Sequence, residues 1–225
     1  MKPAEREEML YSGGKRVIIG PDKKILLDFI DDLAKKGDCL DIGCGTGELA
    51  DSIVKKGFKV SCCDFSAKAV EIARKNYNLN SVLCDLDEGL PFCDSTFDLV
   101  VASHVMEHVF DPIFVIKEIS RLLKKDGIFL AAIPNDLHIS SRLKILFGIS
   151  YQQLVYLKNS QYKHHTFFSH KLFQDMINKN GLKVHERVSL CRFPKTNRKI
   201  KTHKVSPVTN LFADVFIYKI VKSGL

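Results

Sequence analysis

An apolar run that ends in an acid and opens into three alternating glycines constrains the fold of this chain more than any other feature. The run reads Cys39-Leu40-Asp41-Ile42-Gly43-Cys44-Gly45-Thr46-Gly47, and Asp64 stands at the end of the next apolar run. Glycine permits positive φ and lets a backbone approach a ligand closely. A helix beginning at Glu48 would point its unpaired N–H groups at this turn. The pattern therefore predicts a βα turn that binds a nucleoside cofactor, with Asp64 beside the ribose.

The spacing of the glycines separates two classes of nucleoside cofactor. A dinucleotide fingerprint has the form G-x-G-x-x-G, and its third glycine would fall where this chain has Glu48. A carboxylate at a helix N-terminus is poorly placed for a pyrophosphate. The pattern D-x-G-x-G-x-G instead resembles motif I of the class I S-adenosylmethionine-dependent methyltransferases. S-adenosylmethionine carries no phosphate, so acids around the loop are compatible with it.

Apolar runs that alternate with helical patterns predict one α/β domain. The resemblance implies a Rossmann-like three-layer sandwich with a seven-stranded, mostly parallel sheet in which strand 7 is antiparallel. Strands are expected near residues 38–42, 58–63, 81–84, 97–102, 127–133, 182–190 and 211–221. We divide the single domain, 1–225, into an N-terminal helical cap (1–36), a cofactor-binding half (37–134), a substrate lid (135–168) and a C-terminal helix with an antiparallel strand pair (169–225).

The resemblance covers about residues 20–190, and its nearest branch includes the ubiquinone- and menaquinone-biosynthesis type methyltransferases. It implies that the first acid and the loop backbone hold the methionine moiety, while Asp64 accepts both ribose hydroxyls. Phe65 would pack on the adenine. Asp85 would accept from the adenine amino group, and the Leu86 N–H would serve a ring nitrogen. The full expected cofactor set is Asp41, Gly43, Cys44, Gly45, Gly47, Asp64, Phe65, Asp85, Leu86 and Ser103, with Tyr11 and Arg16 reaching the cofactor carboxylate from the N-terminal segment.

Catalytic candidates follow the fourth expected strand, beside the expected sulfonium. Methyl transfer is an in-line displacement, so a base is needed only when the acceptor bears a proton. His108 is the first candidate base and His104 the second, since histidine titrates near neutral pH. A purely structural role for the Glu107–His108 pair is the alternative. Further along the chain, His164 and His165 are candidates to orient the acceptor.

The same segment raises the question of a metal. His104, Glu107 and His108 match the H-x-x-E-H spelling of inverted zinc proteases. Its place after the fourth strand of a methyltransferase-like domain argues against a peptidase. Ubiquinone-type O-methyltransferases resemble this segment but carry E-x-x-E-H and use a divalent metal. Because His104 replaces the first acid of that pattern, no metal is expected in this chain.

Charge and composition bear on partners and location. Between residues 158 and 204 twelve Lys or Arg stand against two acids, which favours an anionic partner such as a phosphorylated metabolite, anionic lipid or RNA. A solvated basic surface explains the same count. No apolar stretch approaches the ~20 residues of a membrane span, although peripheral membrane contact is compatible with the charge. Seven cysteines without C-x-x-C spacing favour a cytoplasmic location. A monomer or a homodimer is expected.

The sequence thus predicts an S-adenosylmethionine-dependent methyltransferase that acts on a small molecule and releases S-adenosylhomocysteine. O-methylation of a hydrophobic, lipid-linked or glycan-type acceptor is the expected reaction. The apolar residues between Asn135 and Lys158, in the family position of a substrate lid, favour a hydrophobic or lipid-linked acceptor, and ordinary packing over the sheet explains the same residues equally well. One alternative is an RNA methyltransferase, although Ser103-His104 stands where nucleobase amino-methylating enzymes have an N/D-P-P-Y type of loop, and no aromatic-rich basic stretch is present. The other alternative is a non-catalytic, cofactor-binding partner subunit. The presence of an acceptor region argues against it.

Overall fold

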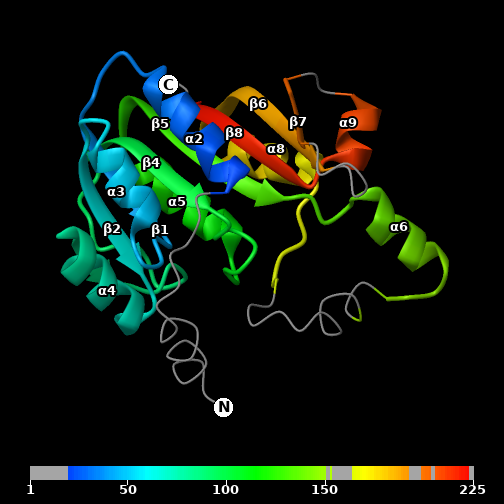
Figure 1. The fold of residues 1–225 in the computed structure, drawn as a ribbon, viewed down its shortest axis with the longest axis horizontal. Coiled ribbons are helices and arrows are strands. Elements are labelled where there is room, and N and C mark those ends of the chain that lie inside the picture. Colours follow the sequence, from blue (N-terminus) through cyan, green and yellow to red (C-terminus); the bar gives the residue numbers. More distant parts are fainter. Residues whose placement is uncertain (1–19, 151–152, 154–163, 193–198, 204–205, 223–225) are drawn as a thin grey trace.

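A computed structural model describes residues 20–150, 153, 164–192, 199–203 and 206–222 of the chain (Figure 1). Helices and strands alternate through most of this span, as the sequence predicts. In chain order the elements are α2 (Pro21–Asp31), β1 (Asp38–Ile42), α3 (Glu48–Val54), β2 (Lys59–Asp64), α4 (Ala67–Tyr77), β3 (Asn80–Leu83), β4 (Phe97–Ser103), α5 (Pro112–Leu122), β5 (Leu123–Pro134), α6 (Ile139–Leu146), α8 (His170–Lys179), β6 (Leu182–Arg192), β7 (Lys199–Thr202), α9 (Pro207–Phe212) and β8 (Val215–Lys222).

One twisted sheet carries all the described strands, in the order β3-β2-β1-β4-β5-β8-β6-β7. The pairs from β3 to β5 are parallel. β8 lies antiparallel between β5 and β6, with Ala131 opposite Tyr218 and Val188 opposite Ile217. The expected mostly parallel sheet with an antiparallel last strand is confirmed.

The C-terminal region adds detail that the sequence pattern does not predict. A short strand, β7, pairs antiparallel with β6 at the edge of the sheet and extends the expected seven strands. The last strand begins at Val215 and not near residue 211, because a capping box at Ser206 and Pro207 at the first helical position start α9. Leu211 and Phe212 therefore belong to a helix.

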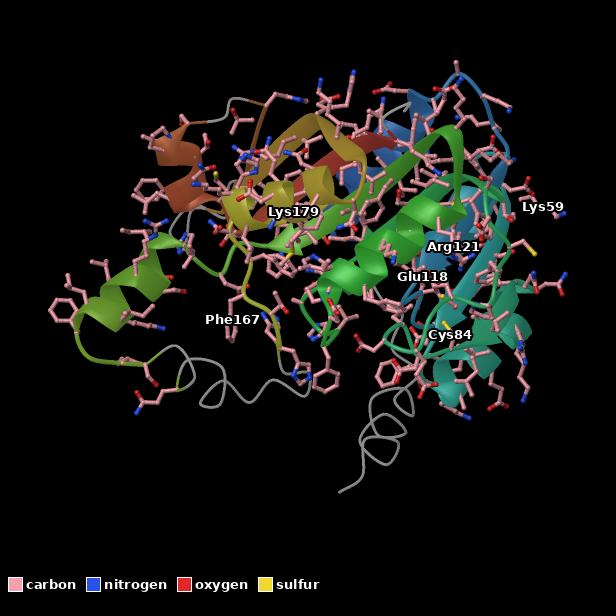
Figure 2. The ribbon with its side chains drawn as sticks, turned by 180° about the vertical axis from the view of Figure 1, so that it is seen from behind. Lys59, Cys84, Glu118, Arg121, Phe167 and Lys179 are labelled. Carbon is pink, nitrogen blue, oxygen red and sulfur yellow. The ribbon has the colours of Figure 1, made fainter. Side chains whose placement is uncertain are left out.

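Two apolar layers flank the sheet and make the sandwich three-layered. On one face, α2 and α3 bury Leu26, Ile30 and Ile53 against the strands. On the other face, α5 and α8 bury Ile119 and Phe173, and both helices stand in front of the sheet when the molecule is seen from behind (Figure 2). The carboxyl ends of β1, β2, β4 and β5 consequently meet along one edge, where parallel α/β sheets bind ligands.

Candidate active site

The glycine loop after β1 adopts the backbone that its sequence predicts. Gly43, Gly45 and Gly47 have φ of 63°, 55° and 95°, a region that side chains with a Cβ rarely enter. A Cβ on Gly43 would lie 2.4 Å from Val105 Cγ2, so space as well as conformation requires glycine there. The Cys44 N–H donates to the Cys63 carbonyl over 3.1 Å and ties the loop to β2. The loop is thus packed tightly against β2 and the segment after β4.

Asp64, at the end of β2, holds the loop and the next helix together. Its Oδ2 accepts from the Gly45 N–H at 2.8 Å, and its Oδ1 accepts from the Ser66 N–H at 2.9 Å. Burial raises the pKa of Asp64, and these backbone N–H groups oppose that rise. Each carboxylate oxygen can accept a second hydrogen bond, so the expected ribose contacts are compatible with both bonds.

Asp41 is a buried acid without a complete set of partners. Only 1% of the residue is exposed, and its Oδ2 has no hydrogen-bond partner among the described residues. Burial raises the pKa of Asp41 to about 7; Lys23 opposes the rise and the Asp64 charge adds to it. A buried carboxylate with an unpartnered oxygen is costly unless a ligand completes it. The atom therefore points to a cationic or hydrogen-donating ligand at the methionine end of the expected cofactor.

Apolar side chains are exposed where the adenine is expected. Phe65, after β2, and Leu83, at the end of β3, are each 54% exposed. Asp85 follows in the loop after β3, and its Oδ1 accepts from the Asp87 N–H at 3.0 Å. Leu86 is buried beside it. An aromatic ring after β2 and an acid after the adjacent strand β3 suit a purine that carries an amino group.

The segment after β4 is a turn and not a helix, because the His108 N–H donates to the Val105 carbonyl at 2.9 Å in a three-residue step. His104 stands at its start with φ of 57°. The His104 ring lies between two acids, with Nε2 3.0 Å from Asp22 and Nδ1 3.3 Å from Glu107. Burial opposes its charge, but the hydrogen bonds with Asp22 and Glu107 outweigh it and raise the pKa of His104 to about 9. His104 is therefore protonated at neutral pH, which is unfavourable for a general base.

Two more histidines meet beside Glu107. His108 Nε2 lies 3.9 Å from Glu107 Oε1, and the rings of His108 and His164 pack edge to face with centroids 5.1 Å apart. The His165 N–H donates to the Glu107 carbonyl at 2.8 Å, which fixes the segment before α8 against the turn after β4. The His165 ring packs on the Phe110 ring, with the two ring centroids 4.2 Å apart. Of the two neighbouring histidines, only His164 joins the cluster.

Three acids that the structure places at the candidate site were not predicted from the sequence. Asp22, near the start of α2, pairs with His104. Asp136, just beyond β5, lies 3.2 Å from His164 Nδ1. The Asp87 carboxylate accepts from the Phe110 and Asp111 N–H groups and joins the loops after β3 and β4. Asp136 had a usable signal, since an acid directly after a buried parallel strand falls on the ligand-binding edge of the sheet.

Three predicted cofactor-binding residues remain to be placed, and the structure describes one of them. Ser103 ends β4, and its buried Oγ has no hydrogen-bond partner among the described residues. Tyr11 and Arg16 lie outside the described residues. Asp41, the glycine loop, Asp64, Phe65, Asp85 and the turn after β4 therefore follow one edge of the sheet.

Residues 40–131 match the family described as "Methyltransferase domain". A ubiquinone biosynthesis O-methyltransferase from Pelagibacter ubique is 37% identical over 99 residues, 43% of this chain and 41% of the relative. One from Neisseria meningitidis is 38% identical over 114 residues, 45% of this chain and 46% of the relative. The mitochondrial enzyme from Bos taurus is 29% identical over 163 residues, 69% of this chain and 44% of the relative. The chain thus spans less than half the length of these three curated relatives.

Solved structures agree on the fold. A methyltransferase from Thermotoga maritima has a TM-score of 0.70 at 22% identity, covering 97% of this chain and 94% of that one. A second, from Archaeoglobus fulgidus, has a TM-score of 0.63 at 20% identity, with coverages of 89% and 92%. In its sheet order, its glycine loop and the match over residues 40–131, the chain resembles the class I, S-adenosylmethionine-dependent methyltransferases. Within that class, the chain resembles the ubiquinone biosynthesis O-methyltransferases.

Proposed function

We propose that this protein transfers a methyl group from S-adenosylmethionine to a hydroxyl oxygen of a hydrophobic, lipid-linked or glycan-type small molecule. The observation that carries the cofactor assignment is the Oδ2 of Asp41, which is buried beside the glycine loop and has no hydrogen-bond partner within the described part of the chain. The ammonium of the methionine moiety would satisfy this atom with a charge-assisted hydrogen bond. Asp64 and Asp85 would then bind the ribose and the adenine from the ends of the next two strands.

The chain's own residues would act mainly by alignment. The rigid loop and Asp64 would fix the sulfonium, and an acceptor held in line with it would react with little further reorganisation. On the acceptor side, the raised pKa of His104 leaves His108, with His164 beside it, as the imidazoles available to the acceptor. His165 would supply an edge of the acceptor site through its stack with Phe110.

The acceptor class is inferred from the segment after β5. Helix α6 has no buried residue, and Leu146 and Phe147 at its end are 77% and 81% exposed. Arg142 and Lys144 lie on the same helix, and no acid does. In Figure 1 α6, which belongs to the expected lid (135–168), stands apart from the sheet. The exposed apolar side chains support a hydrophobic acceptor. The two basic side chains are compatible with an acceptor that also carries an anionic group.

Calorimetric titration with S-adenosylhomocysteine tests the cofactor assignment. We expect one site per chain in the wild type, and at least ~10-fold weaker binding in Asp64→Ala, which loses the acceptor for both the loop and the ribose. Asp175→Asn, an exposed acid on α8, is the matched control and should bind as the wild type does. Folded wild-type protein that binds neither S-adenosylmethionine nor S-adenosylhomocysteine would refute the proposal.

The acceptor is best sought by transfer of a tritiated methyl group into fractions of a cell lysate. Partition of the labelled product into the organic phase supports a hydrophobic acceptor, and label in RNA or protein contradicts it.

We further propose a reducing, cytoplasmic compartment, because all seven cysteines lie among the described residues and none forms a disulfide. Within the described residues, no helix has the length and apolar character needed to cross a membrane.

A further inference from the structure

We propose that Cys63 and Cys84 form a reversible oxidation site, in which a disulfide between them lowers the affinity of the protein for its cofactor. The two cysteines lie at the ends of β2 and β3, immediately before Asp64 and Asp85. The effect on the cofactor rests on the proposed function, because these two acids are the groups proposed to bind the ribose and the adenine. The oxidation of the thiols does not depend on that function.

The pairing of β2 with β3 brings the two cysteines to one face of the sheet. Cys63 lies opposite Val82, and Cys84 follows Val82 by two positions (Figure 2). Side chains two positions apart along a strand point to the same face. The backbone pairing continues past the end of β3, because the Cys84 N–H donates to the Asp64 carbonyl at 3.0 Å. Cys84 accordingly packs against the apolar cluster that contains Cys63.

The two thiols are hydrogen-bonded to each other and differ in acidity. The hydrogen bond from Cys63 lowers the pKa of Cys84, although burial and the charges of Asp64 and Asp85 oppose this change. The same bond, and then burial, raise the pKa of Cys63. Oxidants react with the thiolate and not with the thiol. Since Cys84 is half-buried and Cys63 is fully buried, we expect an oxidant to react first with Cys84.

The other cysteines are placed differently. Five of the seven are buried, and only Cys84 and Cys93 have more than slight access to solvent. Cys62 is the neighbour of Cys63 on β2 but points to the opposite face, where it lies in the other apolar layer and bonds to Cys44. That second thiol pair is buried on both sides, so an oxidant in solution does not reach it.

The oxidation can be written with hydrogen peroxide as the oxidant. The Cys84 thiolate attacks one peroxide oxygen and the O–O bond breaks, which leaves a sulfenic acid on Cys84 and releases hydroxide. The Cys63 sulfur then attacks the sulfenic sulfur, the S–S bond forms, and the leaving hydroxide takes the Cys63 proton as water. The two sulfurs together lose the two electrons that the peroxide gains. Exchange with a small thiol such as glutathione reverses the reaction.

A disulfide at this place would move the chain after β3. Neighbouring strands are ~4.8 Å apart and two residues rise about 6.6 Å, so diagonal Cα atoms lie about 8 Å from each other. A disulfide joins Cα atoms at about 5.5–6 Å and therefore requires the backbone to move. β3 is a four-residue strand at the edge of the sheet, so its end moves more easily than that of β2. Asp85, directly after Cys84, would move with it and away from the adenine.

Peroxide treatment of the reduced, full-length protein, followed by peptide mapping without reduction, tests the oxidation site. We expect one disulfide, between the peptides that carry Cys63 and Cys84. A protease that cleaves after glutamate separates Cys84 from Cys93 at Glu88. Cys63→Ala and Cys84→Ser should lack the disulfide. Cys62→Ala and Cys93→Ser are the matched controls and should form it as the wild type does.

Calorimetric titration with S-adenosylhomocysteine on the same samples tests the consequence. We expect at least ~10-fold weaker binding in the oxidised wild type, because the charged hydrogen bond from Asp85 is displaced. Dithiothreitol should restore the affinity, which separates thiol oxidation from methionine oxidation. Peroxide should change the affinities of Cys63→Ala and Cys84→Ser by no more than about 2-fold. Cofactor bound beforehand should slow the formation of the disulfide.

The two proposals fail separately. Absence of the Cys63–Cys84 disulfide, at a peroxide concentration that modifies Cys93, overturns the oxidation site. A disulfide that leaves the affinity for S-adenosylhomocysteine unchanged, or an equal loss of affinity in Cys84→Ser, overturns its effect on the cofactor. A reduced wild type that does not bind S-adenosylhomocysteine refutes the proposed function, and peptide mapping still decides whether the thiols are an oxidation site.

Discussion

At the scale of single residues, Asp41 is proposed to bind the cofactor, and its burial lowers the stability of the fold when the carboxyl group is ionised. Because its pKa is raised to about 7 in the folded state, the unfolded chain releases this proton first as the pH rises from about 4. The contribution of Asp41 to stability is therefore present below pH 4 and is lost by the time the pH passes 7. Because the pKa lies near neutrality, only part of the molecules carries this buried charge at pH 7. Binding of the cofactor's ammonium, as proposed above, would favour the charged form.

Asp41→Asn should accordingly raise the free energy of unfolding at pH 8 by about 1–3 kcal/mol and weaken S-adenosylhomocysteine binding at least ~10-fold. The gain should shrink toward pH 5, where the wild-type acid is already protonated. Urea unfolding at the two pH values and calorimetric titration measure both effects. A variant that is less stable than the wild type at pH 8, or that keeps full affinity, would contradict this account.

His170 changes stability with pH in the opposite direction to Asp41, because folding lowers its pKa. Burial, and then the charge of Arg187, lower the pKa of His170 to about 4, and its Nδ1 lies 3.1 Å from the Tyr218 hydroxyl. The unfolded chain therefore takes up a proton below about pH 6.5 that the folded chain refuses. We expect the wild type to lose stability between pH 6.5 and 4, and His170→Gln to lose less. Thermal unfolding across that range measures the difference, and parallel curves for the two proteins would exclude His170 as the cause.

At the scale of elements, two limits require glycine in the β1–α3 turn: the positive φ of the backbone and the lack of space for a Cβ. Mutations at two glycines can separate these limits. Gly43 and Gly181 both have positive φ, but an added Cβ meets Val105 at Gly43 and nothing within 4 Å at Gly181. Gly181→Ala should cost about 1–2 kcal/mol from the backbone alone. Gly43→Ala should cost about 1–3 kcal/mol more and also lose cofactor binding. Urea unfolding with calorimetry distinguishes them, and equal costs with cofactor binding kept would show that the contact with Val105 is unimportant.

The sequence predicts the elements well wherever one local pattern determines them. The strands β1, β2 and β4 follow from apolar runs, and the glycine loop follows from its spacing. The strand β7 was missed because it is short, basic and at the edge, where no apolar alternation marks it. The pairs His104–Asp22 and His164–Asp136 were missed because they join residues 82 and 28 positions apart. Local spacing carries no signal for such contacts.

At the scale of the whole molecule, β8 completes the sheet. Phe216, Ile217, Tyr218 and Ile220 are almost fully buried, and both edges of the strand are paired. Removal of the chain after Phe212 should therefore leave β5 and β6 unpaired along these edges and abolish cooperative unfolding. Calorimetry and near-ultraviolet circular dichroism measure this. A truncated chain with a sharp thermal transition would show that the remaining strands form a stable sheet without β8.

The position of β8 also bears on how the chain is made. β5 leaves the ribosome first, and its neighbour β8 follows roughly 80 residues later, about 4–16 s at ordinary rates of translation. Throughout that interval the nascent chain presents the edge of β5, with Phe129 and Ile133, to other chains. We expect protein synthesised without chaperones to aggregate from this half-built sheet, and yield to improve when translation past residue 134 is fast.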